Sequence, residues 1–228
     1  MSYVFEPAER PFVPVVGTDA RFPVRRIYCV GRNYADHARE MGHDPDAEPP
    51  FFFDKPADVL TLADGNLPYP PMTADLHYEG ELVVGLACGG VDLTPDQSAA
   101  AIFGYAVGND FTRRDLQADA KKLRRPWDLS KGFEGAAVIG PMTPVEHCAH
   151  IDAAAIRSLV NGEVRQAADL SHMIWPVASL IATLSQYVTL AAGDLIFTGT
   201  PAGVGSVKKG DVVRVEIDGL EPIETKIV

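Results

Sequence analysis

The sequence has few of the features that mark several large classes of protein. Only three of its 228 residues are cysteine, and Cys29, Cys88 and Cys148 are scattered, with no C-x-x-C pair. We therefore expect reduced thiols rather than a disulfide framework, which is typical of a cytoplasmic protein. No run of eighteen apolar residues is present, so no membrane span is predicted. Residues 1–7 lack a cationic stretch followed by an apolar one, and we expect no signal peptide.

Positive charge is also scarce. The chain has 20 Lys and Arg against 31 Asp and Glu, a net charge of −11. This balance argues against nucleic acid as a partner, because phosphates require clustered cations. The basic pairs Arg113-Arg114, Lys121-Lys122 and Arg124-Arg125 nevertheless follow closely after Asp110. A local positive field there suits a small anionic substrate, although we interpret Lys121, Lys122 and Arg124 as the solvated face of a helix.

Common catalytic signatures are missing as well. The sequence contains no G-x-S-x-G, no H-E-x-x-H and no G-x-G-x-x-G after the first expected strand. Its six histidines form no H-x-H pair, which argues against a metal site built from histidines.

Short apolar runs separated by turn signals predict a mainly β, α+β protein: a mixed β roll or sandwich with a few short helices. Residues 1–23 are rich in proline and aromatics and are expected to form an N-terminal arm, and residues 24–228 a single domain. Strands are expected at 24–30, 49–56, 76–85 and 104–110, and hairpin turns at Asn161-Gly162 and Asp218-Gly219. Helices are expected at 33–42 with Asn33 as N-cap, at 94–103 with a capping box, at 112–123 and at 176–187.

The most informative local feature is an acidic trio. Glu79 and Glu81 are two apart on an expected strand, so their side chains point to the same face, and Asp110 ends another strand. Three such acids cannot all stay ionised together without a cation. Oxygen ligands alone favour a hard ion, Mg²⁺ or Mn²⁺ before Zn²⁺. The alternative is three unrelated surface acids.

Two helical pairs are further candidates. His37 and Glu40 are three apart, so on a helix the carboxylate can fix the imidazole tautomer and support a water-activating base. Arg114 and Gln117 have the same spacing; the arginine can bind a carboxylate and the glutamine a keto oxygen. The alternatives are an exposed pair for the first and an Arg–Asp surface network for the second.

Two loops complete the set. Lys131, in a glycine-containing loop, can stabilise an oxyanion, or it is an ordinary loop lysine. The glycine-rich loop that follows residues 193–197 carries Thr200, whose hydroxyl can hold a substrate carboxylate with nearby backbone N–H groups. A tight structural turn is the competing interpretation.

Six motifs in order resemble the fumarylacetoacetate hydrolase family over residues 24–228. They are Gly31-Arg32-Asn33-Tyr34-Ala35-Asp36-His37, Phe53-Asp54-Lys55-Pro56, Glu79-Gly80-Glu81-Leu82, Asp110-Phe111-Thr112-Arg113-Arg114-Asp115-Leu116-Gln117, Lys131-Gly132-Phe133 and Thr198-Gly199-Thr200-Pro201-Ala202-Gly203-Val204-Gly205. The resemblance implies a β-rich roll, a homodimer and one divalent cation, Mg²⁺ or Mn²⁺, per chain.

Carried over by position, the resemblance also implies roles for single residues. The metal ligands are Glu79, Glu81 and Asp110; the water-activating pair is His37 with Glu40, and Lys131 stabilises the oxyanion; Arg32, Arg114, Gln117 and Thr200 lie near the substrate. Two residues depart from the family pattern. Gly80 replaces a larger apolar residue, which we expect to loosen the strand or enlarge the pocket, and Asp54 replaces an uncharged residue.

Residues 22–27 and 49–53 are most similar to the fumarylpyruvate hydrolases of bacterial gentisate breakdown. The expected reaction is hydrolysis of a small anionic acylpyruvate, fumarylpyruvate, to fumarate and pyruvate. General acylpyruvate hydrolysis and oxaloacetate decarboxylation remain open, because both pass through the same pyruvate enolate. A structural cation-binding module is the non-enzymatic alternative, and it gives His37 and Glu40 no role.

Overall fold

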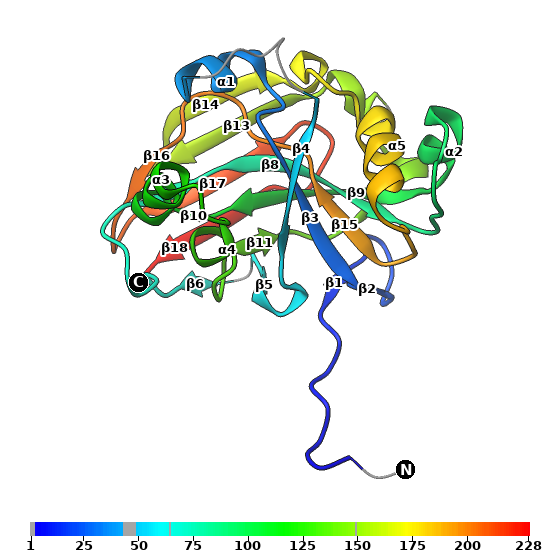
Figure 1. The fold of residues 1–228 in the computed structure, drawn as a ribbon, viewed down its shortest axis with the longest axis horizontal. Helices are drawn as coiled ribbons and strands as arrows, with labels where there is room; N and C mark the ends of the chain where they lie inside the picture. The colour runs from blue at the N-terminus through cyan, green and yellow to red at the C-terminus, as the bar shows by residue number, and fades with distance from the viewer. Residues whose placement is uncertain (1–2, 43–48, 64, 149) are drawn as a thin grey trace.

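Two β-sheets form the body of the molecule (Figure 1). The computed structural model describes residues 3–42, 49–63, 65–148 and 150–228. The larger sheet has the strand order β4 (Phe51–Lys55), β3 (Arg26–Gly31), β15 (Asp194–Phe197), β8 (Gly80–Leu86), β9 (Ile102–Asp110), β11 (Ala137–Ile139) and β5 (Leu60–Leu62), with β12 (Thr143–Pro144) also paired to β9. The second sheet has the order β14 (Glu163–Asp169), β13 (Ala155–Val160), β17 (Val212–Ile217), β18 (Ile223–Ile227) and β6 (Asn66–Leu67).

Smaller elements surround these sheets. A three-stranded sheet contains β10 (Thr112–Arg113), β7 (Leu76–Tyr78) and β16 (Gly205–Val207). The α-helices are α1 (Ala35–Glu40), α2 (Pro95–Ala100), α3 (Arg114–Leu123), α4 (Asp128–Lys131) and α5 (Val177–Tyr187), and single 3₁₀ turns are η1 (Ala57–Val59), η2 (Val145–His147), η3 (Ile151–Ala153) and η4 (Leu170–His172). The predicted mainly β fold with a few short helices is confirmed. In the described part of the chain, no helix is long and apolar enough to cross a membrane.

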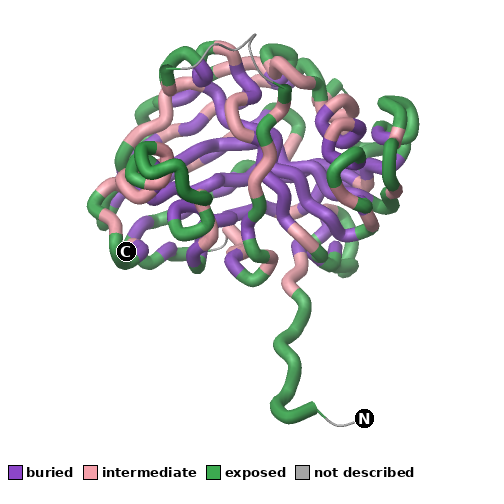
Figure 2. Tube along the Cα trace, in the orientation of Figure 1, coloured by how far each residue is buried: buried purple, intermediate pink, exposed green. Residues whose placement is uncertain are grey.

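The core lies between the two sheets, where β8 and β9 pack against β13 and β17. Every residue of β8 and β15 is buried, as Figure 2 shows for the centre of the larger sheet. Strands covered on both faces are apolar along their whole length rather than in alternation, which is the pattern of Leu82-Val83-Val84 in β8. This rigid centre holds the ends of the strands that carry the acidic trio.

The expected N-terminal arm contains two different structures. Residues 3–10 are exposed and lead away from the body (Figures 1 and 2), and residues 1–2 lie outside the described residues. The strands β1 (Phe12–Pro14) and β2 (Arg21–Pro23) then form a hairpin. The buried Val13 and Phe22 anchor this hairpin in the core.

The helix predicted to follow Gly31 begins later than expected. Tyr34 is the residue before its first turn, and the prediction of Asn33 as N-cap was wrong. The Asn33 amide instead donates to the carbonyls of Trp175 (3.1 Å) and Thr198 (2.9 Å) and accepts from the Trp175 N–H (2.8 Å). Satisfying three buried or partly buried backbone groups is a stronger use of this side chain than capping one short helix.

Three other helix and strand boundaries differ from the predicted ones. The capping box at Thr94 and Gln97 is confirmed, but α2 ends at Ala100 because the chain enters β9. The next helix begins at Arg114, since the two residues before it pair with β7. The strand expected at 76–85 divides at Glu79 into β7 and β8, which belong to different sheets. Pairing with distant strands overrides local helix and strand preferences in each case.

The two predicted hairpins differ in their turns. Asn161 (φ 53°) and Gly162 (φ 82°) both adopt left-handed backbone conformations, as a two-residue type I′ turn requires. Asp218-Gly219 also connects antiparallel strands, β17 and β18, but through a longer loop.

Gly80 is required by packing between the sheets. A Cβ atom at this position would collide with the Ser158 side chain and lie 2.9 Å from Val215 Cγ1. The expectation that Gly80 loosens the strand or enlarges the pocket was therefore wrong, because the second sheet occupies the space.

We predict that Gly80→Ala lowers the free energy of unfolding by about 1–3 kcal/mol, the usual effect of overpacking a tight core. Chemical denaturation measures this change. Gly65→Ala is the matched control, since a Cβ there meets no atom within 4 Å. Equal stability of Gly80→Ala and wild type would contradict the packing argument.

Candidate active site

One cavity gathers nine of the ten predicted site residues. It opens beside β8 and β9 and is lined by Val30, Gly31, Arg32, His37, Met41, Phe53, Glu79, Glu81, Asp110, Arg114, Gln117, Lys121, Trp127, Lys131 and Thr200. The tenth predicted residue, Glu40, lies behind His37 and contacts it. Residues from well-separated parts of the sequence thus meet in one place.

The acidic trio forms the floor of this cavity. Carboxylate oxygens of Glu79, Glu81 and Asp110 lie within 4.8 Å of one another, and all three residues are buried. Glu79 stands at the break between β7 and β8, and its backbone carbonyl accepts from the Asp110 N–H at 2.8 Å. The antiparallel pairing of β8 with β9 therefore brings the end of one strand to the start of the other.

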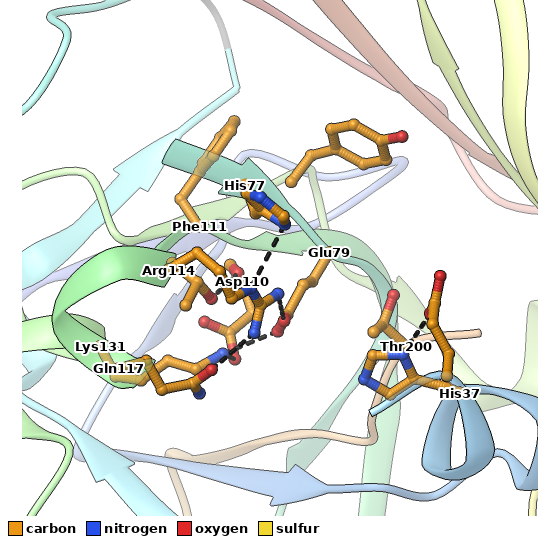
Figure 3. Close-up of polar contacts among 12 residues, drawn as sticks. His37, His77, Glu79, Asp110, Phe111, Arg114, Gln117, Lys131 and Thr200 are labelled. Carbon is orange, nitrogen blue, oxygen red and sulfur yellow. Dashed lines mark hydrogen bonds and ion pairs between the residues drawn. The ribbon is translucent and has the colours of Figure 1, made fainter. Parts of the chain in front are cut away.

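Three cations accompany these carboxylates. Lys131 Nζ lies 2.7 Å from Glu79 Oε2 and 2.8 Å from Asp110 Oδ2, and Arg114 pairs with Glu79 Oε1 (Figure 3). Lys55 Nζ lies 2.7 Å from Asp110 Oδ1. Burial favours the neutral form of Lys131, but the charges of Asp110 and Glu79 prevail and raise its pKa. Lys131 is therefore a buried permanent cation.

The carboxylates differ in how well they are compensated. Burial alone would raise the pKa of Glu79, yet Lys131 and Arg114 hold it well below its usual range. Among the described residues Glu81 forms no ion pair, and its Oε2 accepts one hydrogen bond, from the Gly199 N–H at 2.8 Å. Burial, followed by the charges of Asp110 and Glu79, raises the pKa of Glu81 well above the usual range. Additional positive charge at this point would ionise Glu81.

The donor set fits a divalent cation. All the candidate ligand atoms are carboxylate oxygens, the donors that Mg²⁺ and Mn²⁺ prefer. The buried Asp110 Oδ1 faces Lys55 as an ion pair but has no hydrogen-bond partner in the structure. Glu81 is the uncompensated charge, and Glu79 and Asp110 complete the trio. These three residues would hold the metal.

His37 and Glu40 form the predicted pair. Nδ1 of His37 lies 3.0 Å from Glu40 Oε2, and the same carboxylate accepts from the Gly203 N–H at 3.2 and 3.3 Å. An ionised carboxylate only accepts, so Nδ1 carries the proton and Nε2 is left as an acceptor. Burial lowers the pKa of His37 against the opposing effects of Glu79 and Glu40. A neutral imidazole at neutral pH can serve as a base.

Arg114 and Gln117 lie on one face of α3, as their spacing predicts. Arg114 donates from Nε to His77 Nδ1 at 3.3 Å and from a terminal nitrogen to Gln117 Oε1 at 2.6 Å. The Gln117 NH₂ group therefore remains as a donor at the cavity wall. Thr200 lines the cavity as expected, but its hydroxyl is already engaged within the protein: it donates to the Gly80 carbonyl at 2.9 Å and accepts from Gln166 at 2.8 Å. This hydroxyl proton ties the loop to β8.

Sequence reasoning missed Lys55, His77 and Gln166. Lys55 is 2% exposed and donates to the carbonyls of Phe111 and Lys131 as well as pairing with Asp110. A signal for it existed, because Lys55 alternates with Phe53 on a strand and so shares its inward face. No local signal marks His77 or Gln166, whose roles depend on contacts with α3 and Thr200.

Comparisons with known proteins find a matching family model and similar proteins that cover most of the chain. The family described as Fumarylacetoacetate (FAA) hydrolase C-terminal matches residues 26–228. A fumarylpyruvate hydrolase from Ralstonia sp is 39% identical over 184 residues, covering 81% of this chain and 95% of that protein. A mitochondrial oxaloacetate decarboxylase from Dictyostelium discoideum is 36% identical over 197 residues, covering 86% and 90%.

A solved structure is similar over the whole chain. The crystal structure of fumarylpyruvate hydrolase from Pseudomonas aeruginosa in complex with Mn²⁺ and pyruvate matches with a TM-score of 0.97 at 46% identity. The match covers 100% of this chain and 99% of that chain.

We predict that Glu81→Gln changes the thermal stability of the protein in opposite directions with and without metal, relative to the wild type. Mn²⁺ should raise the unfolding temperature of the wild type, because the ion binds the folded state, and this rise should be largely lost in the variant. In EDTA the variant should be at least as stable as the wild type near neutral pH, since it lacks the buried uncompensated carboxylate. Thermal unfolding measures both.

The sign of the pH dependence follows from the raised pKa of Glu81. The folded state binds this proton more tightly than the unfolded state, so metal-free wild type loses stability as pH rises through the raised pKa. The stability of metal-free Glu81→Gln should not fall in this way as the pH rises. Glu146→Gln, an exposed acid outside the cavity, is the control. An undiminished response of Glu81→Gln to Mn²⁺ would remove Glu81 from the ligand set.

Proposed function

The chain belongs to the fumarylacetoacetate hydrolase family, and on this basis we propose that it is a metal-dependent hydrolase that cleaves a carbon–carbon bond in an acylpyruvate. Fumarylpyruvate, giving fumarate and pyruvate, is the proposed substrate. One observation carries the proposal: the His37–Glu40 pair and the acidic trio line or adjoin the same buried cavity. The similar Pseudomonas aeruginosa structure, which contains Mn²⁺ and pyruvate, supports it.

The residues of the cavity form two groups: carboxylates that would hold a divalent cation, and side chains that would bind the substrate. A divalent cation bound by Glu79, Glu81 and Asp110 supplies a Lewis acid that stabilises negative charge on the pyruvate half of the substrate. Gln117 can donate to a keto oxygen, and Arg32 and Arg114 add positive charge near the substrate carboxylate. These side chains orient the acylpyruvate before the chemical step.

His37 supplies the base for hydrolysis. Its Nε2 takes a proton from water, and the water oxygen adds to the carbonyl carbon of the acyl group. The buried Lys131 cation stabilises the resulting alkoxide. Collapse of the alkoxide breaks the carbon–carbon bond, releases fumarate and leaves the pyruvate enolate, which takes up a proton to give pyruvate.

Decarboxylation of oxaloacetate is the second candidate, supported by the Dictyostelium discoideum relative. That reaction needs no attacking water and gives the His37–Glu40 pair no part as a base. A structural cation-binding module likewise leaves the pair without a role. The buried, carboxylate-supported imidazole therefore favours hydrolysis.

The remaining features of the protein stay predictions. A cytoplasmic homodimer rests on the resemblance and on the free cysteines Cys29, Cys88 and Cys148, and sedimentation measures the oligomer. The division into an arm at 1–23 and a catalytic domain at 24–228 also stays a prediction: the family match begins at residue 26, whereas Val13 and Phe22 of the expected arm pack in the core.

We predict that the protein with Mn²⁺ or Mg²⁺ hydrolyses fumarylpyruvate and that EDTA abolishes the activity. The conjugated enol of an acylpyruvate absorbs ultraviolet light, and its absorbance disappears on cleavage, so a spectrophotometer follows the reaction. Fumarate and pyruvate should appear in equal amounts. A protein that leaves the absorbance unchanged with either metal would contradict the proposed function.

We predict that His37→Ala lowers the rate of fumarylpyruvate hydrolysis by about 10²–10⁴-fold with unchanged Mn²⁺ affinity. Oxaloacetate decarboxylation, if the wild type performs it, should decline much less. Steady-state kinetics and calorimetry on one preparation measure these effects, and His172→Ala, at an exposed histidine, is the control. Equal loss of both activities with intact metal binding would mean that His37 is not the base.

A further inference from the structure

A second hollow opens from the catalytic cavity toward the surface. This outer groove, about 580 Å³ in volume, lies between β4 and the connection from α3 to α4. Four residues line both spaces and form the neck between them: Arg32, Phe53, Lys121 and Trp127. Any substrate longer than pyruvate that enters by this route extends through the neck.

The helix α3 presents polar groups to the cavity in a fixed order. Arg114, Gln117 and Lys121 have i, i+3, i+7 spacing, so they share one face, and all three line the cavity. Lys121 lies about 10 Å along the helix axis from Arg114, which is paired with Glu79 at the inner end. Lys122 is exposed, as a solvated basic face predicts, whereas Lys121 is only partly exposed.

Lys121 has no acidic side chain in direct contact among the described residues. Among the described residues it forms no ion pair, and its Nζ lies 5.3 Å from the centre of the Trp127 ring. Burial, followed by the charges of Arg114 and Arg32, lowers the pKa of Lys121 to about 8. Like charges are thus gathered at the neck, and an anion bound there would relieve their repulsion.

An aromatic wall connects the neck to the catalytic groups. The Trp127 ring packs edge-on against Phe51 and Phe53, with ring centres 5.0 and 5.6 Å apart. The Phe53 ring in turn lies 5.0 Å from Lys131 Nζ. A planar conjugated chain can lie along these rings, with one end near Lys131 and the other near Lys121.

We infer that Lys121, at the neck of the cavity, binds a carboxylate at the distal end of the acyl group. The inference rests on the proposed function and makes it more specific: the protein selects acylpyruvates whose acyl group ends in a carboxylate, as the fumaryl group does, over those that end in a methyl group. Lys121 is a specificity residue, since it is remote from the bond that breaks.

The test compares fumarylpyruvate with acetylpyruvate, which has the same reacting core and no distal carboxylate. Lys121→Met keeps the length of the side chain and removes its charge. It should lower kcat/KM for fumarylpyruvate by about 10–100-fold, through KM, because a charged hydrogen bond is lost. Acetylpyruvate kinetics should change less than about twofold. Lys121→Arg should restore most of the loss, and Lys122→Met is the matched control.

The outcomes distinguish failure of the distal subsite from failure of the proposed function. Equal effects of Lys121→Met on both substrates, or none on fumarylpyruvate, would overturn the distal subsite and leave the proposed hydrolysis standing. A wild-type protein that cleaves neither acylpyruvate would overturn the proposed function and the subsite together. Loss confined to fumarylpyruvate, with rescue by arginine, supports the subsite.

Discussion

Three carboxylates buried within 4.8 Å of one another repel strongly, and their burial requires positive charge in the same cavity. The chain supplies that charge from three directions. Lys55 comes from β4, Lys131 from the end of α4, and Arg114 from the first turn of α3. These elements are short, and the ion pairs that their cations form with Glu79 and Asp110 help to hold them against the two sheets. The ion pairs that compensate the buried carboxylates therefore also help to hold β4, α4 and α3 in place around the cavity.

The same cluster explains why Glu81 is distinctive. Glu79 and Asp110 each contact cations of the protein, whereas the described residues provide Glu81 only with a backbone N–H. The protein thus compensates two charges itself, and a divalent cation bound to the trio would compensate the third. We expect the affinity of the trio for a divalent cation to depend on this imbalance, because a fully neutralised trio would gain little from binding one.

Local rules predicted much of this arrangement. The spacings of His37 with Glu40 and of Arg114 with Gln117, the capping box at Thr94 and the turn at Asn161-Gly162 depend on nearby residues, and the structure has each of them. The resemblance to a known family added the ligand set and the reaction, which spacing alone left open.

Other features depend on distant parts of the chain and had no local signal. Asn33 binds the backbones of Trp175 and Thr198, and Glu79 stands where the chain passes between two sheets. Gly80 is explained only by Ser158 and Val215 on the opposite sheet. Such contacts join residues about 80 to 165 positions apart, beyond the range of any periodicity argument.

The anchoring of the His37–Glu40 pair has a consequence for biosynthesis. Both residues belong to the first fifth of the chain, in a helix of six residues that is too short to be stable alone. The helix is held by Asn33 against Thr198 and by Glu40 against Gly203, and the preceding strand β3 pairs with β15. A nascent chain that has emerged from the ribosome only to residue 190 lacks all three supports. These supports of the helix that carries His37 and Glu40 are thus present only once residues 194–203 are in place, so a product truncated before them would contain both side chains without three of the contacts that hold their helix.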